Sequence, residues 1–533
     1  MLHSRKKLTV AMTLAMSYQT VLAQFSSPLN LSDINGDNGF VIVGESTGDR
    51  AGQSVSSAGD VNGDGIDDLI IGADETDNSG FKAGSSYVIF GSDTSLSNPF
   101  NLSTIDGLNG FKINGESAGD YLGRSVSSAG DINGDGITDL IISAIGADPN
   151  GASQAGSTYV VFGSNKGFPN PFNLSSIDGL NGIKINGESA SDLSGSAVSS
   201  AGDVNGDGVD DVIIGAISAE PYGATWAGKS YVVFGNETGL PGTLDLSAID
   251  GLNGFNIYGQ LGGDRSGCSV SSAGDINGDG IDDLIIGAWG SDPNGAFYAG
   301  RSYVVFGSNS GFPNPLNLST LGGDIGFKIN GESAEDYSGA SVSAAGDING
   351  DGFDDLIIGA SGADPNGEAE AGSSYVVFGS DTAFPNPFNL SLIDGLNGFK
   401  INGEATGDWS GWSVSSAGDV NGDGIADLII GAHRADSNGA SETGSSYVVF
   451  GSETGFQNPF NLLTLNGVNG FKINGEQASD RFGGSVSSAG DVNGDGIDDL
   501  IIGAKLAVIK GSTRPGKSYV VFGDDTIFKD GFE

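Results

Sequence analysis

A nine-residue motif occurs seven times in this 533-residue chain and constrains its fold more than any other feature. The motif reads Ser-Ala-Gly-Asp-(Val/Ile)-Asn-Gly-Asp-Gly, with one Ser replaced by Ala, and its first Asp falls at 60, 131, 203, 275, 347, 419 and 491. Successive copies are 71 residues apart once and 72 residues apart five times. Self-similarity at a fixed period indicates a chain built from repeated structural units.

Each repeat contains four short apolar or alternating segments bounded by Gly, Asn, Asp and Pro. In the fifth repeat we expect strands at Ser341–Ala345, Asp355–Ala360, Tyr375–Gly379 and Phe327–Gly331. Their length and their β-branched and aromatic content favour strands over helices. Four strands per repeat predict an all-β fold, a β-propeller of four-stranded antiparallel blades. A linear solenoid is the alternative, and it would need atypical capping repeats at its ends.

The order of strands at the two ends of the repeat region favours a closed ring. The region opens with a strand around Phe40–Gly44, of the type expected last in each blade, and closes with the strand Tyr519–Gly523. In a ring, the first strand completes the last blade and leaves no sheet edge unpaired. Seven repeats therefore predict a seven-bladed propeller over residues 24–523, closed by the N-terminal strand and followed by a C-terminal tail at 524–533.

The first residues have the pattern of a secretion signal. A basic start at residues 5–7 precedes an apolar segment at 8–16 and a small-residue cleavage site ending at Ala23. This order predicts a signal peptide at 1–23 and a protein that is secreted or on the cell surface. A membrane anchor is the alternative, although the apolar segment is short for a membrane span.

The composition is strongly acidic, with 67 Asp and Glu against 22 Lys and Arg and a formal charge of −45. This charge disfavours nucleic acid and anionic membranes as partners. The regular apolar segments exclude a disordered polyanion, so the remaining interpretation is that bound cations neutralise many carboxylates. Cys268 is the single cysteine, so no disulfide within the chain can stabilise an exported fold.

The acidic residues concentrate in one loop per repeat, Asp-x-Asn-Gly-Asp-Gly-x-x-Asp. Oxygens at positions 1, 3, 5 and 9 can converge when Gly at position 6 permits a tight curl, and the carbonyl of position 7 can join them. Hard oxygen ligands in an irregular loop favour Ca²⁺ over Mg²⁺, zinc or copper, with solvated Asx turns as the alternative. The candidate ligands of up to seven Ca²⁺ ions are Asp60, Asn62, Asp64, Ile66, Asp68, Asp131, Asn133, Asp135, Ile137, Asp139, Asp203, Asn205, Asp207, Val209, Asp211, Asp275, Asn277, Asp279, Ile281, Asp283, Asp347, Asn349, Asp351, Phe353, Asp355, Asp419, Asn421, Asp423, Ile425, Asp427, Asp491, Asn493, Asp495, Ile497 and Asp499.

These loops, the Ile70–Ala73 segment that follows the first of them and the Val-(Val/Ile)-Phe-Gly strands together resemble FG-GAP repeats, which build the propeller at the head of integrin α subunits. The resemblance covers residues 25–523. It implies that Asp60, Asn62, Asp64 and Asp68, with their counterparts in the other repeats, are calcium ligands. It also implies an adhesion or ligand-recognition module. Integrins carry the loop in only some blades, and their leg domains and membrane helix have no counterpart here, so we expect no integrin β partner.

Two connections vary strongly between the repeats: the one joining the second and third strands, and the one leading into the first strand. In a blade of alternating strands, both lie on the face opposite the acidic loops. We interpret this aromatic-rich face as the site of a protein or glycan ligand, with unconstrained drift of the loops as the alternative. The candidate contact residues are Tyr121, Tyr222, Trp226, Trp289, Tyr298, Tyr337, Trp409, Trp412 and Phe482.

One segment, Gly115–Gly119, matches the hydrolase pattern Gly-x-Ser-x-Gly. That pattern needs a helix after the serine and a histidine to activate it, but a strand is predicted here. The one histidine after the signal, His433, is expected to be a solvated residue in a loop of another blade. We therefore expect no enzyme activity. The alternatives to recognition are a passive calcium-stabilised structural protein of the envelope or matrix and a non-catalytic accessory of a hydrolase.

Overall fold

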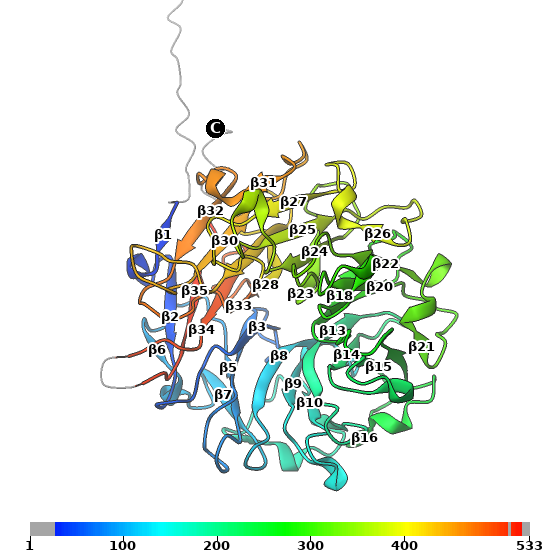
Figure 1. The fold of residues 1–533 in the computed structure, drawn as a ribbon. Coiled ribbons are helices and arrows are strands. Elements are labelled where there is room, and N and C mark those ends of the chain that lie inside the picture. Colours follow the sequence, from blue (N-terminus) through cyan, green and yellow to red (C-terminus); the bar gives the residue numbers. More distant parts are fainter. Residues whose placement is uncertain (1–26, 510–512, 525–533) are drawn as a thin grey trace, which may run out of the picture.

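The computed structural model describes residues 27–509 and 513–524. The predicted signal peptide and most of the predicted tail therefore lie outside the described residues. Seven β-sheets surround a central axis as the blades of a propeller, in chain order around the ring (Figure 1). The predicted all-β, seven-bladed fold is confirmed. Each sheet has five strands, one more than the sequence predicts.

Four strands of each blade form an antiparallel meander from the axis outward. The innermost strands are β3 (Ser54–Gly59), β8 (Leu122–Gly130), β13 (Ser194–Gly202), β18 (Val270–Gly274), β23 (Ser341–Gly346), β28 (Ser413–Gly418) and β33 (Ser485–Gly490). The second strands are β4 (Asp68–Ala73), β9 (Asp139–Ala144), β14 (Asp211–Ala216), β19 (Asp283–Ala288), β24 (Asp355–Ala360), β29 (Asp427–Ala432) and β34 (Asp499–Ala504). The third strands are β5 (Ser85–Ile89), β10 (Ser157–Val161), β15 (Lys229–Val233), β20 (Arg301–Val305), β25 (Ser373–Val377), β30 (Ser445–Val449) and β35 (Lys517–Val521). The fourth strands are β7 (Gly110–Asn114), β12 (Gly182–Asn186), β17 (Gly254–Tyr258), β22 (Gly326–Asn330), β27 (Gly398–Asn402), β32 (Gly470–Asn474) and β2 (Gly39–Val43).

The fifth strand of each sheet is a short parallel strand at the outer edge, contributed by the next blade. This edge strand lies in the connection that leads to the fourth strand of its own blade, but it pairs with the fourth strand of the preceding blade. It therefore links neighbouring blades. These strands are β1 (Leu29–Asn30), β6 (Phe100–Asn101), β11 (Phe172–Asn173), β16 (Thr243–Asp245), β21 (Leu316–Asn317), β26 (Phe388–Asn389) and β31 (Phe460–Asn461). Short 3-10 helices follow them at η1 (Leu31–Asp33), η2 (Leu102–Thr104), η4 (Leu174–Ser176), η6 (Leu246–Ala248), η8 (Leu318–Thr320), η11 (Leu390–Leu392) and η12 (Leu462–Thr464). The others are η3 (Pro149–Gly151), η5 (Pro221–Gly223), η7 (Pro293–Gly295), η9 (Gly323–Ile325) and η10 (Pro365–Gly367).

The N-terminal region closes the ring, as predicted. Strand β2 pairs antiparallel with β35, so that Gly39 faces Val521 and completes the seventh blade. Strand β1 pairs with β32 of the sixth blade. The strand expected at Tyr375–Gly379 lies instead at 373–377, because Gly379 leaves the ladder and donates its N–H to Asp355 Oδ1 at 2.8 Å.

The apolar core consists of layers between adjacent blades. The second strands, such as β24 with the sequence Asp-Leu-Ile-Ile-Gly-Ala, are buried along their whole length because both faces are covered. The glycine of this segment allows the neighbouring backbone to approach closely. A Cβ at Gly359 would lie 2.0 Å from the carbonyl oxygen of Gly411 in the next blade. Packing between blades thus explains why apolar residues run without alternation here.

A buried tyrosine of each third strand connects its blade to the preceding one. In six blades its hydroxyl donates to a glutamate at 2.5–3.0 Å, in the pairs Tyr87–Glu45, Tyr159–Glu116, Tyr231–Glu188, Tyr375–Glu332, Tyr447–Glu404 and Tyr519–Glu476. In the fourth blade the tyrosine is Tyr303, and Gln260 of the third blade stands in place of the glutamate. Gln260 accepts from Tyr303 at 3.4 Å and from Arg301 at 3.0 Å. Burial raises the pKa of Glu188, but hydrogen bonds from Lys229 and Tyr231 more than offset this and leave that pKa lowered.

Candidate functional site

The seven acidic loops lie between the first and second strands of every blade and therefore share one face of the ring. In the first loop, the Asp60 carboxylate accepts backbone N–H bonds from Gly63, Asp64 and Gly65 at 2.7–3.0 Å. Gly65 has φ of +89°, which permits the curl expected at position 6. In the other six loops, the first Asp likewise accepts from the amides of positions 5 and 6.

The ninth residue of each loop is a fully buried aspartate at the start of the second strand. In the first blade, Asp68 accepts N–H bonds from Gly91 at 2.9 Å and from Val61 at 3.1 Å. Burial, and then the charges of Asp64 and Asp60, raise the pKa of Asp68 to about 8 despite these bonds. A carboxylate in this environment is costly to ionise without a cation.

The donor set of these loops fits a hard cation, but their carboxylates are turned to their own backbone amides. Within the described ranges, no three Asp, Glu, His or Cys side chains are gathered closely enough to hold a metal ion. The loops nevertheless offer only oxygen donors, and the fully buried Asp68 has no basic side chain among its hydrogen-bond partners there. The side chains that would hold calcium are those of positions 1, 3, 5 and 9, and the ion would neutralise their charge.

The eighth position of the loop has a role that the sequence analysis missed. In five blades it is an aspartate whose Oδ2 accepts the backbone N–H of the first Asp in the preceding blade's loop. These pairs are Asp67–Asp491, Asp210–Asp131, Asp282–Asp203, Asp354–Asp275 and Asp498–Asp419, at 2.8–3.0 Å. Thr138 and Ala426 occupy this position in the second and sixth blades. The loops of blades two to five are thus joined in one series, and those of blades six, seven and one in another.

The opposite face is different in every blade, as three equivalent positions show. We call them the mouth positions because they surround the central channel on this face. The residue ten before the loop is Arg50, Tyr121, Leu193, Arg265, Tyr337, Trp409 or Arg481. The residue seven before the loop is Gln53, Arg124, Ser196, Cys268, Ala340, Trp412 or Gly484. The residue after the second strand is Asp74, Ile145, Ile217, Trp289, Ser361, His433 or Lys505.

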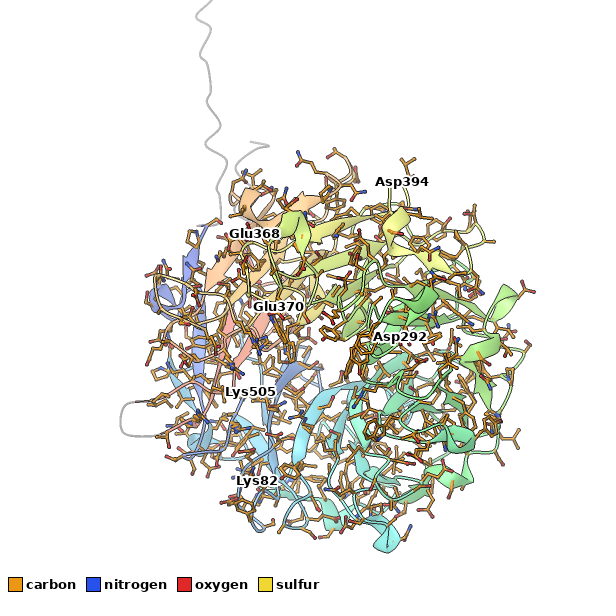
Figure 2. The ribbon with its side chains drawn as sticks, viewed as in Figure 1. Lys82, Asp292, Glu368, Glu370, Asp394 and Lys505 are labelled. Carbon is orange, nitrogen blue, oxygen red and sulfur yellow. The ribbon has the colours of Figure 1, made fainter. Side chains whose placement is uncertain are left out.

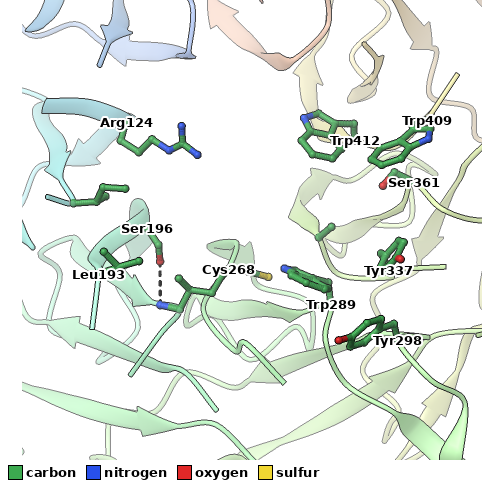
Figure 3. A pocket seen from close by; sticks show the side chains of 13 residues that line it. Arg124, Leu193, Ser196, Cys268, Trp289, Tyr298, Tyr337, Ser361, Trp409 and Trp412 are labelled. Carbon is green, nitrogen blue, oxygen red and sulfur yellow. Dashed lines mark hydrogen bonds between the residues drawn. The ribbon is translucent and has the colours of Figure 1, made fainter. Parts of the chain in front are cut away.

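A cavity of about 650 Å³ opens at this channel mouth. Twelve of its thirteen lining residues occupy mouth positions, and Tyr298 is the other. Figure 3 shows Arg124 on one side of the opening and the indole rings of Trp289, Trp409 and Trp412 on the other. The volume falls in the range of small-molecule binding pockets.

The predicted aromatic contact residues divide into three groups. Trp289, Tyr298, Tyr337, Trp409 and Trp412 come together in the lining of the cavity. Tyr121, Tyr222 and Trp226 lie outside the cavity lining, Tyr222 being 80% exposed. The prediction for Phe482 is wrong, because its side chain is fully buried and packs edge-on against Tyr519 at 5.5 Å. Arg481, not Phe482, is the equivalent of the predicted Trp409.

The expectation that His433 is solvated is also wrong. Its side chain is buried and lies 4.5 Å from Trp412, measured between ring centroids. Burial, and then the charges of Arg481, Arg434 and Lys505, lower the pKa of His433 to about 3. The tryptophans that were predicted to contact ligand therefore also bury this histidine.

The mouth also holds basic residues that the sequence analysis did not single out. Arg50, Arg124, Arg265, Arg481 and Lys505 occupy mouth positions, against the single acidic residue Asp74. Aligning the seven repeats and reading these three positions together would have found them. Figure 2 shows Lys505 nearer the axis than Lys82.

Three proteins of known name are similar to this chain over part of its sequence or in their structure. Human phosphatidylinositol-glycan-specific phospholipase D is 30% identical over 298 residues, which are 55% of this chain and 32% of that protein. Integrin alpha-PS5 of Drosophila melanogaster is 32% identical over 199 residues, 36% of this chain and 17% of that protein. This chain therefore spans about a third or less of the length of these relatives. The crystal structure of the V. cholerae biofilm matrix protein Bap1 is similar at a TM-score of 0.33 and 13% identity, covering 91% of each chain.

None of the helices in the described residues is long and apolar enough to cross a membrane.

The FG-GAP repeat profile matches residues 51–89, 122–161, 194–233, 269–305, 338–377, 410–449 and 482–521. Each match begins near the first strand of a blade, contains its acidic loop and ends with its third strand. With seven matched repeats in a seven-bladed propeller, this chain belongs to the FG-GAP repeat family, in the integrin-alpha type of propeller.

Proposed function

We propose that this protein is a calcium-stabilised recognition module that binds an adhesion partner through the face opposite its acidic loops. The observation that carries the proposal is the contrast between the two faces. One face repeats the same acidic loop seven times, whereas the other places a different set of three mouth residues in each blade. Uniform loops suit a shared stabilising role, and a varied face around a cavity suits recognition.

Calcium is proposed for the acidic loops because of their chemistry. Each loop places aspartates at positions 1, 5 and 9 and an asparagine at position 3, and the buried ninth residue is costly to ionise alone. A bound divalent ion would neutralise this charge, and binding only the folded state would raise stability. Extracellular modules bind calcium weakly enough to depend on the high concentration outside cells, which agrees with the predicted secretion signal.

Recognition is proposed in preference to catalysis. His433, the one histidine after the predicted signal, is buried against Trp412 with a pKa lowered to about 3, so it is a weak base at neutral pH. The relative named as a phospholipase D matches this chain over only 32% of its own length. A passive structural role is the second candidate, since the tyrosine–glutamate contacts and acidic loops would suit a scaffold.

Two measurements test the proposal. Thermal unfolding of the mature chain with calcium and with excess chelator should differ strongly, with close to one bound ion per loop by elemental analysis. Binding to arrays of glycans and matrix proteins should then be lost in the double variant Trp409→Ala, Trp412→Ala. The matched control is Leu396→Ala, which removes a side chain 88% exposed on the acidic-loop face. Unchanged melting in chelator with no bound metal would contradict the calcium role, and binding that survives the double variant would contradict the assigned face.

A further inference from the structure

The channel mouth concentrates positive charge in a chain that is otherwise strongly acidic. Its 21 positions hold five Lys or Arg and one Asp, whereas the whole chain has 22 basic and 67 acidic residues. Arg124 projects into the cavity and is exposed, and its one ion pair is with Asp74 at 3.3 Å. Lys505 follows the second strand of the seventh blade, near the axis (Figure 2). Arg50 forms an ion pair with Glu75 at 3.1 Å, and Arg481 forms one with Glu442 at 3.0 Å. The positive charge that the mouth presents is therefore that of Arg124, Arg265 and Lys505.

Two of these cations, Arg265 and Lys505, form no ion pair among the described residues, although Asp74 is one of the charges that act on Lys505. Lys505 is absent from every ion pair there, and its pKa is lowered to about 8 by burial, then by Arg124 and other neighbouring charges. Arg265 lies between two indole rings, 5.0 Å from Trp226 and 5.1 Å from Trp289. Arg434, next to the mouth, stacks 3.8 Å from the Trp409 ring, and its Nε has no hydrogen-bond partner. None of these three residues lines the cavity, so they contribute to its electrostatic potential without contacting a ligand there.

The other wall of the cavity is aromatic, and its rings are not parallel. Trp409 and Trp412 are inclined by 39°, while Trp289 is inclined by 65° to Tyr298 and by 75° to Tyr337. A flat nucleobase is held best between parallel rings, which these pairs do not provide. A pyranose ring needs only one aromatic surface for its C–H face, and its hydroxyls need small polar groups. Ser361 in the lining supplies such a group. The Ser196 hydroxyl, also in the lining, donates to the Gly267 carbonyl at 3.3 Å and accepts from the Ile217 N–H at 3.2 Å.

The geometry points to an acidic sugar as the ligand of this cavity. We propose that the carboxylate of a uronic or sialic acid residue lies at Arg124, the cation that lines the cavity, while its ring packs against Trp412 or Trp289. Lys505 lies outside the lining but near enough for its charge to act on Arg124, so it adds to the attraction at longer range. Figure 3 shows Arg124 and Trp412 facing each other across the opening. This inference rests on the proposed role of the face in recognition and gives that role a ligand class.

The overall charge also restricts how acidic the ligand can be. A net charge of −45 repels nucleic acids and densely sulfated polymers at long range. An oligosaccharide with one carboxylate per sugar carries less charge than these polymers, so the protein repels it less. At physiological ionic strength, charges more than about 8 Å away are largely screened, so the nearby basic residues dominate the potential inside the cavity. An oligosaccharide with isolated carboxylates therefore fits better than a polyphosphate.

The test is calorimetric titration of the calcium-loaded mature chain with three acidic probes: trigalacturonate, a hyaluronan tetrasaccharide and 3′-sialyllactose. The neutral counterparts are the methyl ester of trigalacturonate and lactose. At least one acidic probe should bind with a Kd below about 1 mM, and its neutral counterpart about tenfold more weakly. Affinity should fall as salt is raised, because the contact is between partly exposed charges.

Variants identify the site. R124Q should weaken binding about tenfold, and K505Q should weaken it by a smaller factor because Lys505 lies outside the lining. W412A should weaken binding about tenfold without changing the salt dependence. The matched control is K166Q, which removes a lysine from the loop whose Ser164 N–H donates to Val61 on the acidic-loop face. Melting temperature checks that each variant is folded. If R124Q does not fold, the salt dependence and K505Q still decide the question.

The proposal fails if none of the acidic probes binds, if the neutral counterparts bind equally, or if binding persists in both R124Q and W412A. It also fails if a hexaglutamate peptide binds more tightly than every sugar with the same Arg124 dependence, since the ligand would then be an acidic peptide. The broader recognition role stands apart from these results. It would survive if a neutral glycan or a protein bound in a Trp412-dependent manner.

Discussion

The carboxylate of Asp210 accepts a 2.8 Å hydrogen bond from the backbone N–H of Asp131, which is the first residue of the acidic loop in the preceding blade. This bond joins two candidate calcium loops directly. Asp210→Ala should lower the stability of the calcium-loaded protein by about 1 kcal/mol, since it removes the acceptor of a part-buried N–H. Thermal unfolding in calcium measures the change.

The sixth blade offers the reverse experiment. Ala426 occupies the position that Asp210 has in its own loop, so Ala426→Asp should add the missing link and raise the melting temperature in calcium. Because the existing links form two series of loops, calcium should bind in two classes, and Ala426→Asp should merge them into one by joining the loops of blades five and six. If Asp210→Ala left the melting temperature in calcium unchanged and Ala426→Asp lowered it, position eight would not couple the loops.

Tyr231→Phe should destabilise the protein by about 1–2 kcal/mol at neutral pH, because it removes a 2.8 Å hydrogen bond to a charged glutamate. The pKa of Glu188 is lowered in the folded state, so this stabilisation is present above the unfolded value of 4.5 and is lost as the pH falls below it. Denaturant unfolding at several pH values tests both statements. Tyr303→Phe is the matched control and should cost less, since its partner Gln260 is neutral and 3.4 Å away.

Asp336→Asn should stabilise the protein at pH 7.5, on the order of 1 kcal/mol. Burial raises the pKa of Asp336 to about 6 from 3.8, so the wild-type loses stability as the pH rises through this range. The asparagine keeps an oxygen for the N–H of Ser333, which donates at 2.9 Å, and carries no charge. The difference between variant and wild-type should vanish near pH 4. Asp394→Asn, at an exposed peripheral site (Figure 2), controls for simple loss of a carboxylate.

Asp351→Ala should remove one calcium ion per chain and leave the others bound. Asp351 is exposed at position five of the fifth loop, where ligation is its proposed role. Elemental analysis after dialysis against calcium measures the stoichiometry, and the melting temperature should fall in calcium but not in chelator. Asp324→Ala, in η9 and outside every acidic loop, is the control. Equal metal content in the two variants would contradict the assignment of this loop.

The repeats predicted the architecture because strand length, strand order and the acidic motif are all local properties of the chain. The closing strand followed from its order alone, since Phe40 begins a segment of the kind that ends each blade. The two-residue edge strands such as β11 were not predictable, because two residues have no period. The links through Asp210 and Glu188 depend on which loops become neighbours in space. Aromatic character alone could not separate Phe482, which is buried, from Trp412, which lines the cavity.

The closure of the seventh blade also has a consequence for biosynthesis. Strand β2 pairs with β35, the last strand of the described residues, so the ring cannot close before β35 has been synthesised. Before the ring closes, the unpaired N-terminal strand and the open edge of β35 are complementary surfaces. Loss of residues 27–43 by proteolysis would leave that edge open, and two such molecules could pair there. An intact N-terminal strand is therefore a condition for keeping this sheet edge paired within one molecule.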